Sequence, residues 1–307
     1  MAKTTFEELL DAGVHFGHLK RKWNPNMAPY IFMERNGIHI LDLYKTMAKL
    51  EEAASAIKQV AKSGKKILFV ATKKQAKEIV AEQVKRVNMP YVTERWPGGM
   101  LTNFATIRKA VRKMSSIDKM MTQDTYANLS KREKLQITRE RAKLEKQLGS
   151  ISDLNRLPSA IFVVDILKEK IAVAEARKLN IPTFAMVDTN SDPTLIDFPV
   201  PANDDASKSI SLIVKIMVDA IEEGLAERKI EKDKKDEEAE AAAAAAAAAE
   251  KRSDDKVVEE YGDLEDEEAE KVVKEGEGKG TAKPGEGVTK KKEGGKRPRK
   301  PVSKIKK

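Results

Sequence analysis

The chain repeats one pattern, a short apolar run rich in β-branched residues followed by an amphipathic helical segment. The apolar runs lie at residues 65–72, 90–94, 159–165, 183–189 and 198–203, and the helical segments at 74–87, 169–179 and 206–225. Because these runs are apolar almost without interruption, both faces of each predicted strand must be buried. The alternation therefore predicts an α/β fold, a Rossmann-like parallel sheet flanked by helices.

Two other patterns precede or interrupt this alternation. Residues 30–43 hold Asn36-Gly37 between two apolar runs, which predicts a β-hairpin, and a helical pattern over 44–61 follows. Helical patterns at 104–121 and 129–149 flank a polar turn. Two long helices joined by a short loop predict an inserted antiparallel α-helical hairpin, a coiled coil.

The C-terminal part has a different composition. Nine consecutive alanines (241–249) precede an acidic block and then a Gly- and Lys-rich end. Such a segment has too little apolar surface to offset the entropy of ordering, so residues 230–307 are predicted to be a disordered, charged tail. The domain prediction is then an α/β domain at 1–103 and 150–229, the hairpin at 104–149, and the tail.

Charge and composition narrow the function. The chain has 58 Lys and Arg against 49 Asp and Glu, and residues 231–307 hold 20 basic and 21 acidic residues, so the surplus lies in the α/β part. A basic domain of this kind favours a polyanionic partner. The absence of cysteine excludes disulfides and thiol chemistry. Neither an apolar signal core nor a membrane-length apolar run is present, so we expect a cytoplasmic protein without a membrane partner.

Motifs typical of enzymes are missing. After the run at 65–72 comes Lys73-Lys74 rather than G-x-G-x-x-G, and no G-x-x-x-x-G-K-[ST] occurs. We therefore expect no catalytic residues, no cofactor and no small-molecule substrate. A nucleotide-binding Rossmann-type enzyme and a free-standing RNA-binding factor remain as the alternatives.

A metal site is a separate question. His15 and His18 have H-x-x-H spacing, and carboxylates that could join them follow the predicted strands. Helix capping and turn formation explain the same carboxylates without any metal, so we predict none. The residues that would form a site are His15, His18, Asp188, Asp192, Asp204 and Asp205.

Three basic loops are the candidates for RNA contact. The segment 20–24 is irregular and combines three basic residues with a tryptophan; the turn 95–103 has two glycines before a helix N-terminus, and a third basic loop is at 72–74. These features favour phosphate binding with base stacking, although a solvated loop and a simple tight turn explain each one separately. We assign to RNA Lys20, Arg21, Lys22, Trp23, Asn24, Lys73, Lys74, Arg95, Trp96, Gly98, Gly99, Thr102, Asn103, Arg108, Lys109 and Arg112.

Seven motifs in order resemble one known family. They are LLDAGVHFGH, KWNPNMAPYIFMERNGIHILDL, LFVATKKQA, RWPGGMLTNFATI, PSAIFVVD, NIPTFAMVDTNSDP and VPANDDASKSI. Together they look like the family of the bacterial small-subunit ribosomal protein numbered two, from about Phe6 to Gly224. The resemblance implies the same fold and a place on the ribosome where head meets body, near the mRNA exit. It also implies three kinds of partner: small-subunit rRNA, neighbouring small-subunit proteins, and among these the large mRNA-binding ribosomal protein.

Overall fold

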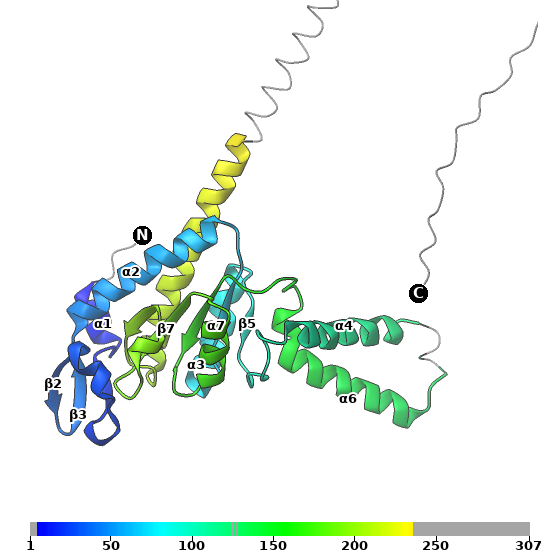
Figure 1. The fold of residues 1–307 in the computed structure, drawn as a ribbon. Coiled ribbons are helices and arrows are strands. Elements are labelled where there is room, and N and C mark those ends of the chain that lie inside the picture. Colours follow the sequence, from blue (N-terminus) through cyan, green and yellow to red (C-terminus); the bar gives the residue numbers. More distant parts are fainter. Residues whose placement is uncertain (1–4, 124–125, 127, 236–307) are drawn as a thin grey trace, which may run out of the picture. The chain divides into compact units, whose positions relative to one another are not determined.

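A five-stranded parallel sheet is the centre of the fold (Figure 1). The structure is a computed structural model and describes residues 5–123, 126 and 128–235. In the sheet the strand order is β5-β4-β6-β7-β8, and every neighbouring pair is parallel. The strands are β4 (Ile67–Val70), β5 (Tyr91–Val92), β6 (Ala160–Val164), β7 (Thr183–Val187) and β8 (Phe198–Pro201). The predicted α/β class is thus confirmed.

Helices cover both faces of this sheet, as the fully apolar strands require. Side chains of β4 alternate between two apolar clusters, with Ile67 and Phe69 in one and Leu68 and Val70 in the other. The first cluster also contains buried side chains of α2 (Leu43–Lys62), α3 (Lys74–Arg86) and a helix over 207–235. Contributors to the second are α7 (Lys170–Lys178) and parts of the helical hairpin.

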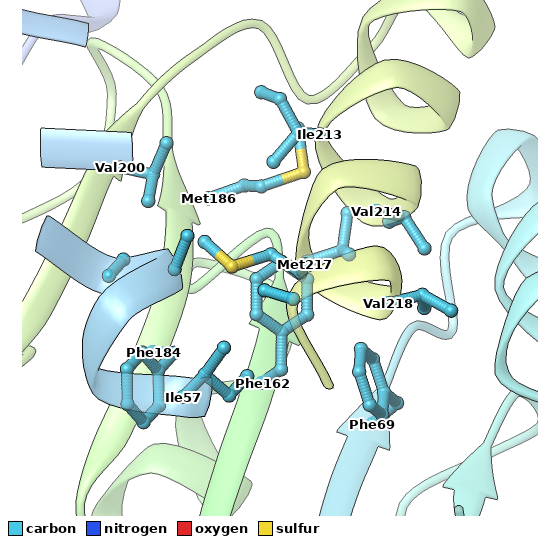
Figure 2. Close-up of a cluster of buried hydrophobic side chains, with 14 of the residues drawn as sticks. Ile57, Phe69, Phe162, Phe184, Met186, Val200, Ile213, Val214, Met217 and Val218 are labelled. Atoms are coloured by element: carbon cyan, nitrogen blue, oxygen red, sulfur yellow. The ribbon is translucent and has the colours of Figure 1, made fainter. Parts of the chain in front are cut away.

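The first cluster combines phenylalanine rings with aliphatic and methionine side chains (Figure 2). Phe69 and Phe162 lie with their ring centroids 5.3 Å apart, and Met217 of the 207–235 helix lies beside them. All three side chains are fully buried. Burying an aromatic or long aliphatic side chain of this kind stabilises a fold by about 1.5–3 kcal/mol, so this cluster fixes the sheet on which the loops are mounted.

A small antiparallel sheet precedes the parallel one. It consists of β1 (Phe16–Leu19), β2 (Ile31–Arg35) and β3 (Ile38–Leu41) in the order β1-β3-β2. Asn36 and Gly37 turn between β2 and β3 with φ of 51° and 72°, the left-handed values that a two-residue hairpin turn needs. The predicted hairpin is confirmed, whereas β1 was not predicted. Short helices surround this sheet: α1 (Phe6–Asp11), η1 (Lys20–Lys22) and η2 (Pro25–Tyr30).

The helical insertion is present as predicted. It consists of α4 (Phe104–Met121) and α6 (Lys131–Leu148), which lie side by side and antiparallel (Figure 1). Apolar side chains of α4 at Val111, Met114 and Ile117 are buried, and Arg141 of α6 binds Asp118 with Nε 2.5 Å from Oδ1. Two short 3₁₀ turns complete the fold, η3 (Gly149–Ile151) and η4 (Pro193–Leu195).

The helix over 207–235 continues beyond residue 229, which was the predicted end of the α/β domain. Ion pairs to α2 hold these last turns, with Lys58 Nζ 2.7 Å from Glu227 Oε1 and Lys62 Nζ 2.5 Å from Glu231 Oε1. The rest of the predicted disordered tail, including the alanine run, lies outside the described residues. Among the helices of the described part, none is long and apolar enough to cross a membrane.

Candidate nucleic-acid interface

The three basic loops lie near the carboxyl edge of the parallel sheet, the edge at which its strands end. Residues 72–74 follow β4 and residues 95–103 follow β5. The loop at 20–24 reaches the end of β7, because the Asn24 backbone N–H donates to the Thr189 carbonyl at 2.8 Å. Segments far apart in the sequence are therefore brought to one edge of one sheet.

Six of the basic residues predicted to bind RNA have exposed side chains that are not in internal ion pairs. These side chains form no ion pair with any described residue, so their charge is available to a partner. They are Arg21, Lys22, Lys74, Arg95, Lys109 and Arg112. Trp23 keeps 37% of its surface exposed while its ring lies 5.2 Å from that of His39.

Other predicted cations are already bound within the protein. Lys73 lies among three carboxylates, with Nζ 2.8 Å from Asp204 and 2.7 Å from Asp205. Burial would lower the pKa of Lys73, but these carboxylates outweigh burial and raise that pKa. Lys20 pairs with Glu34 at 2.7 Å, and Arg108 donates to the Leu154 carbonyl and to Asn155 at 3.0 and 2.6 Å.

The Gly98–Gly99 turn closes around a carboxylate from α7. Glu175 Oε1 accepts from the Gly99 N–H at 2.7 Å and from the Trp96 indole at 3.2 Å. Its Oε2 accepts from the N–H groups of Leu101 and Thr102 at 2.9 and 3.1 Å. Burial would raise the pKa of Glu175, but these donors outweigh it and hold the pKa below its ordinary value.

This arrangement changes the interpretation of the turn. Glu175 occupies the N–H groups of Gly99, Leu101 and Thr102, so these turn amides do not face a phosphate. Trp96 is 6% exposed and packs rather than presenting a ring for stacking. Gly99 has a φ of 83°, as a tight turn requires, whereas the Cβ position of Gly98 faces open space. Close approach of RNA at Gly98 stays a prediction.

Two further predicted residues have local structural roles. Asn24 caps η2, its Oδ1 accepting from the Asn26 N–H at 2.9 Å. Asn103 precedes α4 and accepts from the Thr106 hydroxyl at 2.8 Å. Sequence reasoning missed Glu175, although one signal was present: it is an acidic residue on the apolar face of α7, beside the buried Ala172 and Ala176.

Part of the suggested metal set does come together. His18 Nδ1 lies 2.9 Å from Asp188 Oδ2, and donor atoms of His18, Asp188 and Asp204 all lie within 4.8 Å of one another. Gly17 permits this approach, because a Cβ there would lie 2.6 Å from the Thr189 side chain. His15 and Asp192 are outside this group; Asp192 caps η4.

The cluster has two chemical interpretations. One nitrogen and two carboxylate oxygens suit a divalent cation, and the Oδ2 atom of Asp204 is buried without a hydrogen bond from any described residue, whereas Asp188 Oδ2 already has His18 Nδ1 as its partner. Against a metal, Lys73 already supplies positive charge here, and burial next to Asp188 and Asp165 raises the pKa of Asp204 to about 7. An internal ion-pair network therefore accounts for the same residues.

Comparison with known proteins gives a consistent family. A sequence profile described as Ribosomal protein S2 matches residues 9–224. The small ribosomal subunit protein uS2 of Phocaeicola vulgatus is 71% identical over 232 residues, which cover 76% of this chain and 83% of that protein. The protein of the same name from Porphyromonas gingivalis is 72% identical with the same coverage. That from Bacteroides thetaiotaomicron is 69% identical, over 76% of this chain and 84% of that protein.

Proposed function

The chain belongs to the ribosomal protein S2 family, and we propose on this premise that it binds small-subunit rRNA where head meets body, near the mRNA exit. Its role in the small subunit is structural and it is not an enzyme. In the cytoplasm, as a ribosomal constituent rather than a free factor, it would also help to dock the large mRNA-binding ribosomal protein.

The observation that carries the rRNA proposal is the set of uncommitted cations. Arg21, Lys74 and Arg95 come from three loops near one sheet edge, and Lys109 and Arg112 extend the set along α4. Cations that no internal carboxylate neutralises keep their full attraction for phosphates. Lys73, although basic, is compensated and adds little to that attraction.

A salt titration tests this proposal. Small subunits depleted of the chain are refilled with labelled wild type, Arg95→Glu or Arg112→Glu, and binding is measured over a range of salt. Each substitution removes a phosphate contact, so the slope of log K against log salt should decrease by about 1. Lys215→Glu, an exposed lysine on the 207–235 helix, is the matched control and should leave the slope unchanged. Equal slopes for all four proteins would contradict the proposal.

Docking of a protein partner rests on a different feature. Of the large apolar side chains that are exposed in the described part, more than half belong to residues 6–44, and Phe32 and Tyr44 are 71% and 73% exposed. Exposed aromatic residues gathered in one part of a protein are typical of protein interfaces. We assign this N-terminal part to the neighbouring ribosomal protein.

Replacement of both aromatics tests the assignment. Small subunits that carry Phe32→Asp and Tyr44→Asp should lose the large mRNA-binding protein on sedimentation in moderate salt while the chain itself stays bound. Leu195→Asp, an exposed apolar side chain outside this part, should not release it. Retention of the large protein by the doubly substituted particle would place its docking site elsewhere.

A further inference from the structure

A hollow of about 410 Å³ lies at the carboxyl edge of the sheet, and none of the residues that line it belongs to the His18–Asp188–Asp204 cluster. Thr72, which follows β4, and Lys168 and Glu169, which follow β6, line it together with Arg95 and Ile171. From β4 the chain proceeds outward to β5 and then returns to pair β6 on the opposite side of β4. Such a reversal of strand order is where open α/β sheets bind ligands, and the volume suits a small ligand.

The floor of the hollow is a buried acid with one oxygen free. Glu169 is 3% exposed, and its Oε1 accepts from both the backbone N–H and the hydroxyl of Thr72. No hydrogen bond from the described residues reaches Oε2. Burial raises the pKa of Glu169. A buried acceptor of this kind is suited to a donor brought by a ligand, such as a hydroxyl group or an amine.

The rim of the hollow is positively charged. Lys168 Nζ donates to the Thr72 carbonyl at 3.1 Å but forms no ion pair with a described residue, and Arg95 is likewise exposed and unpaired. Lys77, by contrast, is neutralised by Glu94 at 3.2 Å. Two cations without an ion pair therefore remain at the rim, where they would attract a phosphate, although Lys168 also interacts with the Glu169 carboxylate.

One wall of the hollow is apolar and the backbone around it is fixed. Ile171 is 57% exposed on α7, so an apolar surface is available to a flat ring. Asp165 directly follows β6 and has a φ of 69°, and its Oδ1 accepts from the Lys168 N–H at 3.1 Å. A left-handed conformation in a non-glycine residue is uncommon and persists where the surroundings hold it. Lys168 and Glu169 are thereby held over the end of β4.

We infer that this hollow takes one unpaired ribonucleotide of the rRNA that the chain binds. Lys168 and Arg95 bind its phosphate, the free oxygen of Glu169 accepts from its 2′-hydroxyl group, and its base lies against Ile171. A ribose hydroxyl as the donor would make the site selective for RNA over DNA. The inference rests on the proposed rRNA binding and adds to it a specific point of contact.

Acylation of 2′-hydroxyl groups tests the inference. Small subunits depleted of the chain are refilled with wild type, Lys168→Glu, Ile171→Glu or Lys170→Glu, and the reactivity of each rRNA nucleotide is measured. With wild type, one unpaired nucleotide should become about tenfold less reactive, which corresponds to about 1.4 kcal/mol, because its 2′-hydroxyl group donates to Glu169 and is no longer available to the reagent. Lys168→Glu and Ile171→Glu should restore its reactivity while the remaining protections persist.

Lys170→Glu is the matched control, because Lys170 is exposed and two residues from Lys168 but lines a different hollow. The inference is wrong if all three variants protect the same nucleotides as wild type. A wild-type chain that fails to rebind depleted subunits would instead contradict the proposed function. Free nucleoside monophosphates provide the last comparison: if they raise the Tm of wild type but not of Lys168→Glu, and no rRNA nucleotide is protected, the hollow binds free nucleotides and the assignment to rRNA fails.

Discussion

The end of β4 and the first turns of α4 each present two adjacent basic residues, and in each place one points inward and one outward. Lys73 is surrounded by carboxylates while Lys74 is exposed; Arg108 donates to Leu154 and Asn155 while Lys109 is exposed. The acceptors differ in kind. Those of Lys73 are charged and cancel its charge, whereas those of Arg108 are neutral and leave its charge in place.

This difference separates cations that stabilise the fold from cations that are available to RNA. A buried ammonium surrounded by carboxylates contributes to folding and little to the field outside. An arginine bound to a carbonyl and an amide still contributes positive potential at the base of the helical hairpin. The number of basic residues in a loop therefore overestimates the charge available to RNA wherever acidic side chains from distant segments form ion pairs with those residues.

The largest effect is expected from Lys73→Met. Removing the ammonium leaves the buried Asp204 and Asp165 facing each other without compensation, so the free energy of unfolding should decrease by about 3 kcal/mol. Lys74→Met is the matched control and should cost less than about 0.5 kcal/mol. Urea denaturation of both proteins measures the difference, and equal midpoints would show that Lys73 is not a structural cation.

Glu175→Gln should have the next largest effect. Glu175 accepts hydrogen bonds from the turn at 96–102. A glutamine is neutral and would place its NH₂ group against N–H donors of the turn, so the free energy of unfolding should decrease by about 2 kcal/mol. Because the folded protein lowers the pKa of Glu175, its contribution is complete above the ordinary value of 4.5 and is lost as the pH falls through the lower folded value.

The stability difference between wild type and Glu175→Gln should therefore be constant near neutral pH and shrink in acid. Urea denaturation midpoints measured from neutral to acid pH give this stability difference. Glu78→Gln, which replaces an exposed acid on α3, is the control. A difference that stays constant into acid would mean that the charge of Glu175 does not matter to the turn.

A smaller loss of stability is expected for Arg108→Ala. The two hydrogen bonds of Arg108 connect the start of α4 to residues 154–155, so the free energy of unfolding should decrease by about 1 kcal/mol. Lys109→Ala is the control and should leave the free energy of unfolding almost unchanged. Hydrogen exchange of the amides around Leu154 would locate the effect. Unchanged exchange in that segment would show that the contact does not hold the hairpin to the sheet.

The smallest effect on folding is expected from Lys74→Glu, which should change stability by less than about 0.5 kcal/mol. On depleted small subunits, however, its slope of log K against log salt should be lower by about 1. The companion Lys73→Met, despite its larger effect on folding, should keep the wild-type slope. If Lys73→Met lowered the slope and Lys74→Glu left it unchanged, the two adjacent lysines would have been assigned the wrong roles.

Local patterns in the sequence located most elements of the fold. The predicted helix at 104–121 has the bounds of α4, and the predicted strands contain β4 to β8, because periodicity and burial act over a few neighbouring residues. The strand β1 was missed because Gly17 and His18 do not form a strand-like pattern. It forms because it pairs with β3.

What the amino-acid sequence determined by itself was the layered α/β fold, the helical hairpin and the presence of basic loops at strand ends. Which of those basic residues are free was decided only by the tertiary structure. Glu175 is more than 70 residues from the turn that it fills, and Asp204 is 131 residues from Lys73. Charge acts through space over a few ångströms, and the neighbours that neutralise a cation are chosen by the packing of distant segments.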